Sequence, residues 1–119
     1  MEAVSSSQTS VLRTNLMKVY NQVNQEIFGL GVRKQKIEIY QDKIIYFSEH
    51  KRLPTLEVLT KNHPELVKQM DNAIVSEFKI LLKEQLENEV DLNISTVLMD
   101  YDPKMELAVT TVYRENPLP

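Results

Sequence analysis

The chain has 119 residues, 42% of them hydrophobic and 26% charged, and its formal net charge is −3 at pH 7. That length suits a single domain with its own core, and the acidic balance argues against a nucleic-acid binder, which usually carries a basic excess. The absence of cysteine excludes disulfides, thiolate chemistry and cysteine-based zinc sites, and no apolar run approaches the ~18 residues that span a bilayer, so we expect a cytoplasmic protein that does not insert directly into a membrane.

Residues 1–8 are polar and rich in serine, and we expect them to form a disordered lead-in without a hydrophobic signal core. An amphipathic helix should follow, running to Phe28 with Thr9 or Ser10 as its cap. Its apolar side chains fall within roughly 100° of arc; they are Leu12, Leu16, Val19, Tyr20, Val23 and Ile27. Gly29 and Gly31 are the only glycines, and a glycine at this place favours a left-handed helix end.

A β-hairpin is expected next. Residues 33–40 alternate between apolar and polar side chains, residues 43–49 resume as the partner strand, and Gln41-Asp42 is a plausible tight turn between them. Pro54 makes further strand pairing unfavourable, and Thr55 to Thr60 are expected to form one or two helical turns.

The longest predicted element is a helix over residues 62–90, with Asn62 as its cap and Pro64 in the first turn, where proline is tolerated. Its apolar residues cover about half of the helical cylinder, more than the ~100° stripe of an ordinary surface helix; they are Leu66, Val67, Met70, Ile74, Val75, Phe78, Leu81 and Leu82. Such a helix needs two apolar partners: a sheet, and either another helix or a second copy of the chain.

Two more strands should close the chain, over residues 92–101 and 105–113, joined by an Asp102-Pro103 turn of type I chemistry. In the first of them, Ile94, Thr96 and Leu98 are expected on one face. The predicted fold is therefore α+β, in the order α-β-β-α-β-β, with a four-stranded, largely antiparallel sheet and two helices on one face. We expect one domain over residues 9–115, a tail over 116–119, and a far sheet face that carries Lys36, Glu38, Tyr40 and Thr110. A single sheet with partly apolar outward positions favours a homodimer.

Candidate chemical groups are few. His50 and His63 lack the local spacing of a metal site, so we expect surface or capping roles for both. Asp100, Asp102 and Glu106 could hold a hard cation through their oxygens, but Asp before Pro is a common turn opener, and a turn is the favoured interpretation. Glu77 lies at the rim of the apolar arc, where a carboxylate can have a raised pKa, yet no second carboxylate is identifiable as its counterpart.

Charge is distributed unevenly along the chain. Residues 33–52 hold six basic and three acidic residues, a local excess of +3, whereas residues 84–106 hold seven acidic residues and one basic residue, a local −6. The basic hairpin could meet an acidic protein surface, an anionic lipid face or a nucleic acid, or it could serve solubility alone, which is the favoured interpretation. No phosphate-binding glycine loop or nucleophile elbow is present.

Several segments together resemble one bacterial family. They are the first helix, the hairpin, the Leu53-Pro54-Thr55-Leu56-Glu57 connector, the long helix and the turn Leu98-Met99-Asp100-Tyr101-Asp102-Pro103. In this order they are similar to the MpsC-like (YbcI-type) family, described as part of a Na⁺-translocating, membrane-potential-generating system. The resemblance spans roughly residues 9–115, and it implies a soluble partner or regulator of a membrane ion or bicarbonate system rather than the translocating path itself.

We therefore expect a non-enzymatic accessory or regulatory protein, peripheral to the membrane, that needs no cofactor or metal and binds membrane-complex subunits. The candidate partner or ligand surface consists of Arg33, Lys36, Tyr46, Glu77, Asp100 and Asp102. The alternative is a small-molecule or ion sensor that binds between the sheet and the long helix, near Tyr46, Glu77 and Asp100. A hydrolase using Glu77 or His50 is a third hypothesis, disfavoured because a second catalytic group is missing.

Overall fold

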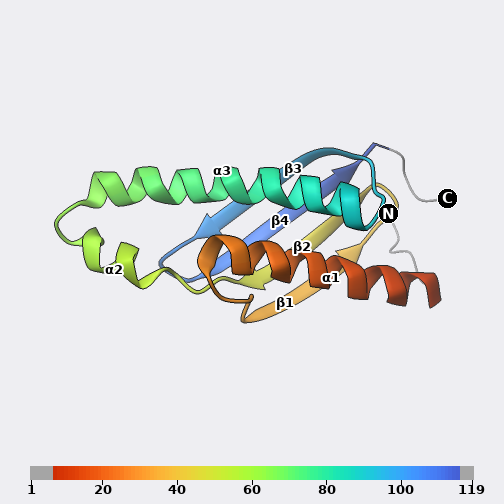
Figure 1. Ribbon diagram of the computed structural model, residues 1–119, viewed down its shortest axis with the longest axis horizontal. Helices are drawn as coiled ribbons and strands as arrows, with labels where there is room; N and C mark the ends of the chain where they lie inside the picture. The colour runs from red at the N-terminus through yellow and green to blue at the C-terminus, as the bar shows by residue number, and fades with distance from the viewer. Residues whose placement is uncertain (1–6, 116–119) are drawn as a thin grey trace.

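Residues 7–115 are described by the computed structural model, and they form three helices and four strands within an envelope of 52 × 25 × 24 Å (Figure 1). In chain order these are α1 (Ser7–Phe28), β1 (Lys34–Ile39), β2 (Lys43–Glu49), α2 (Pro54–Thr60), α3 (Pro64–Glu89), β3 (Ile94–Asp102) and β4 (Leu107–Arg114). The α+β prediction is confirmed, and α2 is the short helical segment expected over Thr55 to Thr60.

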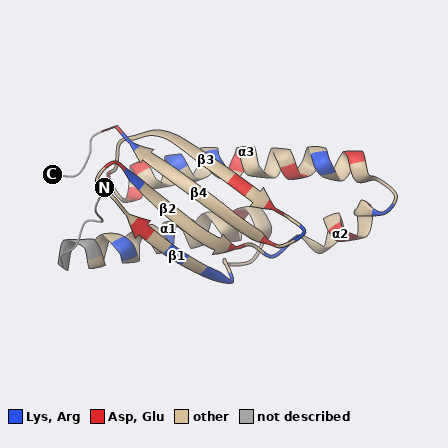
Figure 2. Ribbon diagram, turned by 180° about the vertical axis from the view of Figure 1, so that it is seen from behind, with Lys and Arg blue, Asp and Glu red and all other residues tan. Residues whose placement is uncertain are grey.

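The four strands form one antiparallel sheet in the order β1-β2-β4-β3. The hairpin between β1 and β2 turns at Gln41-Asp42, where the Tyr40 amide donates to the Lys43 carbonyl at 2.9 Å. Helices α1 and α3 lie on one face of this sheet, as predicted, and no described helix lies on the other face (Figures 1 and 2). We call the two sides the inner face and the outer face.

The core fills the space between the inner face and the two long helices. From α3 it receives Phe78, Leu82 and Leu86, and from the strands mainly Ile37, Ile39, Ile44, Tyr46, Ile94, Val97 and Val112. The wide apolar arc predicted for α3 is thus covered by two different parts of the protein. Its C-terminal half packs on the sheet and α1, and its N-terminal half extends past the sheet, where α2 packs against it (Figure 1).

The part that extends past the sheet, residues 54–71, is named the α2–α3 end. Leu56 and Val67 are buried inside it, which explains why so short a helix as α2 is stable there. Leu66, a member of the predicted apolar arc, is 47% exposed, because no described element covers its side of α3.

Helix ends were predicted less well than helix interiors. Gly29 has a φ of 76° and its amide donates to the Gln25 carbonyl at 2.9 Å, which confirms the glycine end of α1. The cap at Thr9 or Ser10 is wrong because α1 already begins at Ser7. The cap at Asn62 is also wrong: His63 precedes α3, and its side chain makes no capping hydrogen bond. Of the predicted lead-in, residues 1–6 lie outside the described part of the chain, as does the tail over 116–119.

Two predictions of sheet face are corrected. The register of β3 on β4 shifts between Ile94 and Thr96, and this β-bulge turns Ile94 to the inner face although Thr96 and Leu98 face outward. Thr110 was expected on the far face, but it is buried on the inner face, where its hydroxyl meets the Tyr20 hydroxyl at 3.1 Å. Lys36 lies on the outer face, as predicted.

Candidate functional site

A buried polar network lies under α1, between that helix and the strands β2 and β4. The Tyr20 hydroxyl is 2.8 Å from Ser48 Oγ, 2.8 Å from His50 Nε2 and 3.1 Å from Thr110 Oγ1. On its other side the His50 ring bonds through Nδ1 to Asn24 Oδ1. All five side chains are buried, so the expected surface or capping role of His50 is wrong.

The neighbours of His50 determine its tautomer. Asn24 donates from Nδ2 to the Leu30 carbonyl at 2.7 Å, so its Oδ1 faces the ring and must accept from Nδ1–H. Nε2 is then unprotonated and accepts a hydrogen bond from the Tyr20 or the Ser48 hydroxyl, each of which lies 2.8 Å away. Both ring nitrogens of this histidine are therefore engaged within the protein.

Burial also holds the network uncharged at neutral pH. It lowers the pKa of His50 from 6.5 to about 4, because desolvation penalises the imidazolium. Burial raises the pKa of Tyr20 to about 12, an effect that the hydrogen bonds from Ser48 and Thr110 oppose. Tyr46 stacks on Tyr20 with ring centroids 4.2 Å apart, and burial raises its pKa well above 10. The network is therefore a neutral, structural part of the core.

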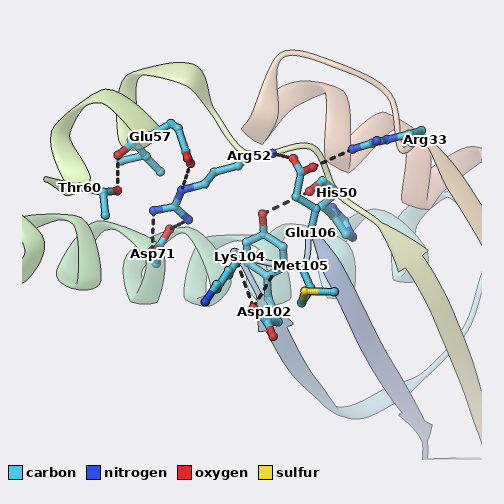
Figure 3. Close-up of polar contacts among 12 residues, drawn as sticks. Arg33, His50, Arg52, Glu57, Thr60, Asp71, Asp102, Lys104, Met105 and Glu106 are labelled. Carbon is cyan, nitrogen blue, oxygen red and sulfur yellow. Dashed lines mark hydrogen bonds and ion pairs between the residues drawn. The ribbon is translucent and has the colours of Figure 1, made fainter.

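A second polar cluster joins the sheet to the α2–α3 end (Figure 3). Arg52 lies between β2 and α2, and its guanidinium meets both carboxylate oxygens of Asp71 on α3 at 3.1 Å. The Glu57 carboxylate on α2 is 3.4 Å from Nε of the same arginine. Because the Arg52 and Asp71 side chains are only 10% and 18% exposed, this forked ion pair is well shielded from water and fixes the orientation of both groups.

Glu106 connects this cluster to the turn between β3 and β4. Its carboxylate accepts from the Arg52 backbone amide and, at 3.0 Å, from the Arg33 guanidinium, and its backbone carbonyl accepts from the His50 amide at 2.9 Å. The first two bonds lower the pKa of this carboxyl group, that from the Arg52 amide most strongly. Glu106 has a φ of 59°, a left-handed conformation that is uncommon for a residue with a side chain.

An open cleft of about 500 Å³ borders this cluster, between α2, the start of α3 and the β3–β4 turn. Pro64 and Val67 supply an apolar side, whereas Lys68 and Lys104 supply positive charge. The solvent-exposed surface of the α2–α3 end is also partly apolar, since Val58 is 78% exposed and Leu66 is nearly half exposed. These features mark the α2–α3 end as a candidate contact surface.

A comparison with known families adds an independent observation. The family model described as "Na+-translocating membrane potential-generating system (MpsC)" matches residues 8–115. The chain belongs to the MpsC family. No curated protein and no solved structure matches it. Of the helices described in this MpsC-family chain, none has both the length and the apolar character needed to cross a membrane.

The candidate residues named from the sequence lie in separate places on this MpsC-family fold. Lys36 and Asp100 both lie on the outer face of the sheet, whereas Glu77 is exposed on α3. Tyr46 is fully buried and its hydroxyl donates to the Leu16 carbonyl at 3.2 Å, so its assignment to a surface is wrong. The sequence pattern alone could not give its face, because both Ile45 and Tyr46 suit the inside of a strand.

Arg33 and Asp102 lie at one end of the sheet, Arg33 directly before β1 and Asp102 as the last residue of β3. Arg33 pairs with Glu106 at 3.0 Å and with Glu49 at 3.9 Å. Asp102 accepts from the amides of Lys104 and Met105 at 3.0 and 3.2 Å, which confirms its predicted role as a turn opener. Asp100, Asp102 and Glu106 do not converge, and the described residues contain no group of three or more metal-ligating side chains.

Sequence reasoning did not identify the two polar clusters. One signal was available for the buried network: Tyr20, Asn24 and Phe28 recur at helical spacing on the apolar side of α1. For Arg52 and Asp71 no local signal exists, because the two residues are far apart in sequence and meet only when α2 folds back on α3.

Proposed function

We propose that this chain is a non-enzymatic accessory or regulatory protein of a membrane system that translocates Na⁺ or another ion. In this proposal it works as a homodimer, is cytoplasmic and peripheral to the membrane, and binds a membrane-complex subunit through its α2–α3 end. The family description supports the link to ion translocation. The observation that favours the α2–α3 end is its position beyond the sheet combined with the exposed side chains of Val58 and Leu66.

The Arg52 cluster supports this assignment because it makes the α2–α3 end rigid. A short helix of seven residues has little stability of its own, yet Arg52 ties it both to Asp71 on α3 and, through its backbone amide, to Glu106 of the β3–β4 turn. A binding surface that is ordered in advance loses less conformational entropy when a partner binds. A hydrophobic surface on a rigid projection suits protein recognition better than catalysis.

The two residues proposed for an enzymatic mechanism, His50 and Glu77, lie in different environments. His50 is buried with both ring nitrogens hydrogen-bonded, whereas Glu77 is exposed on α3. A general base must reach its substrate within hydrogen-bond distance, and this histidine has no such access. These positions support the non-enzymatic part of the proposal.

Co-purification from the native cell tests the proposal. A tagged chain is recovered from membranes solubilised in a mild detergent, alongside Val58→Asp and the matched variant Val11→Asp, which alters a valine 64% exposed on α1. We expect the wild-type and Val11→Asp chains to retain the membrane subunits and Val58→Asp to lose most of them, because a charge at the centre of an apolar contact must be desolvated.

Two results would contradict the proposal at different levels. If the wild-type chain retains no membrane subunit, and a strain lacking the gene keeps normal growth at high Na⁺, the accessory role is wrong. If Val58→Asp retains the subunits as well as Val11→Asp does, the role stands but the α2–α3 end is not the contact surface.

The second candidate function is a ligand sensor. Its site would lie in the cleft beside Arg52 and not between the sheet and α3, where the sequence led us to expect it. Between the sheet and α3 the rings of Tyr20, Tyr46 and Phe78 fill the space, with centroids 4.2 and 5.2 Å from that of Tyr20. The cleft beside Arg52 offers about 500 Å³ and the ammonium groups of Lys68 and Lys104. Because the Glu57 and Asp71 carboxylates in its lining pair with Arg52, these two ammonium groups favour a small anion. A thermal shift with bicarbonate or phosphate that disappears in Lys68→Ala would support it, and no shift with either anion would count against it.

A further inference from the structure

No described element covers the outer face of the sheet (Figure 2), and this face carries several apolar side chains. Phe47, Leu98, Leu107 and Val109 are all exposed there, Leu98 by 54%. They come from three neighbouring strands, β2, β4 and β3, and so form one continuous patch. An antiparallel sheet with one solvated face normally places polar residues on it, and a contiguous apolar patch usually marks an interaction site.

The strand register arranges charge around this patch in a regular way. Lys36 on β1 pairs with Phe47 on β2, Phe47 pairs with Val109 on β4, and Val109 pairs with Asp100 on β3. One row across the sheet therefore reads Lys, Phe, Val, Asp. Both charged ends of this row are exposed.

The neighbouring row repeats the polarity. It runs from Lys34 on β1 through Glu49 and Leu107 to Asp102 on β3, and the Lys34 side chain is 79% exposed. The β1 edge of the outer face thus carries two lysines, followed by Glu38 as the next outward residue, and the β3 edge carries two aspartates. Between the edges lie the apolar patch and Glu49, whose carboxylate is 3.9 Å from the Lys34 ammonium group of the same chain. A surface with this pattern is complementary to its own copy when the copy is placed face to face with it, with the β3 edge of one sheet opposite the β1 edge of the other.

We propose that the outer face is the homodimer interface, in which a second copy of this chain packs sheet against sheet about a twofold axis parallel to the strands. Such an axis, passing between β2 and β4, reverses the strand order of the facing sheet and keeps each row at its own level. Lys36 then faces Asp100 of the second copy, Lys34 faces Asp102 of the second copy, and Phe47 faces Val109 of the second copy. By symmetry each contact occurs twice.

The charge pattern also selects this axis over the other twofold arrangement. An axis perpendicular to the strands would place β1 over β1, where two lysines outnumber Glu38, and β3 over β3, where Asp100 and Asp102 would meet the same two aspartates of the second copy. Like charges across an interface oppose association. Stacked sheets lie about 10 Å apart with their strands within about 30° of each other. An extended lysine side chain on one sheet can reach an aspartate on the other across that gap.

This inference takes only the homodimeric state from the proposed function. It adds that the outer face of the sheet forms the interface of that dimer. A membrane subunit or a lipid surface could also cover an apolar sheet face. Neither alternative accounts for the matched order of charges along two adjacent rows. A second copy of the chain accounts for both rows with a single symmetry operation.

A charge-swap series on the full chain tests the inference, with the monomer–dimer equilibrium measured by sedimentation velocity over a range of concentrations. We expect the wild-type chain to dimerise, and Lys36→Glu and Asp100→Lys each to weaken the dimer by about tenfold or more, because each creates two like-charge contacts. The double variant Lys36→Glu with Asp100→Lys should dimerise again. Within one chain these residues lie on the two outer strands of the sheet, so recovery requires a contact between copies.

The remaining variants separate the possible outcomes. Val109→Asp should be a folded monomer by circular dichroism, and Lys68→Glu, which changes an exposed charge on α3, should dimerise as the wild type does. A wild-type chain that stays monomeric at every concentration, or a dimer that all the outer-face variants retain, would overturn the inference. A monomeric Val109→Asp chain that still retains the membrane subunits would leave the accessory role intact, so the two proposals can fail separately.

Discussion

At the scale of single residues, His50 has surroundings that its sequence neighbours do not suggest. It stands between Glu49 and Lys51, a charged setting typical of a surface loop, yet it is fully buried and bonded to Tyr20, Ser48 and Asn24. Its burial follows from strand alternation, since every second residue from Ile44 onward faces the core. The network satisfies polar groups that would otherwise each cost about 1–3 kcal/mol when buried.

The depressed pKa of His50 predicts a pH dependence of stability. The unfolded chain takes up a proton at this residue near pH 6.5 and the folded protein only near pH 4, so the unfolded state binds more protons between these values, and lowering the pH within that range favours unfolding. We expect the free energy of unfolding to fall by about 2 kcal/mol from pH 7 to pH 5 because of this group. Urea denaturation at the two pH values measures it.

The two histidines of the chain provide a matched comparison for that prediction. His50→Gln should lose much of the difference between pH 7 and pH 5, although it will be less stable overall because the network is incomplete. His63→Gln, at an exposed position before α3, should keep the full difference. A His50→Gln variant with the same pH dependence as the wild type would show that another group is responsible.

At the scale of helices and strands, repeating patterns were a more reliable guide than helix N-caps or the face of one side chain. The hydrophobic spacing of α1 and α3 and the alternation of β1 predicted these elements to within a few residues. The cap expected at Asn62 and the face expected for Ile94 were wrong because each depends on one local detail: the start of α3 after His63 and the bulge near Ser95. Such details arise from tertiary packing rather than from a repeating pattern.

The attachment of α2 to α3 gives a second prediction. Arg52→Met removes the guanidinium while keeping a long side chain, and it leaves the shielded Asp71 carboxylate without its partner. We expect a loss of about 1–3 kcal/mol in the free energy of unfolding, measured by urea denaturation. We also expect faster hydrogen exchange at the amides of α2, because this helix then keeps Leu56 packing and the backbone bond to Glu106 but loses the ion pairs that link it to α3.

Arg33→Met is the control for that variant. The Arg33 side chain is half exposed in its pairs with Glu49 and Glu106, and exposed ion pairs contribute less than about 1 kcal/mol. Equal losses in the two variants, or unchanged exchange in α2 of Arg52→Met, would mean that the Arg52 cluster does not hold the α2–α3 end in place.

At the scale of the whole molecule, two surfaces on different sides of the protein receive different roles. The layer arrangement, with both long helices on one face of a four-stranded sheet, was predictable because the apolar faces of helices and strands must cover one another. The extension of the α2–α3 end past the sheet was not predictable, since it depends on where along α3 the sheet ends. We assign the outer face to a second copy of the chain and the α2–α3 end to a membrane partner.

Site-specific photo-crosslinking in the native cell tests this division most directly. A photoreactive residue is placed at Val58 on the α2–α3 end, at Val109 on the outer face, or at Val11 on α1 as a control, and the crosslinked products are identified by mass spectrometry. The account predicts that Val58 crosslinks to a membrane subunit, Val109 to a second copy of the chain, and Val11 to neither. A membrane subunit captured at Val109 but not at Val58 would contradict it.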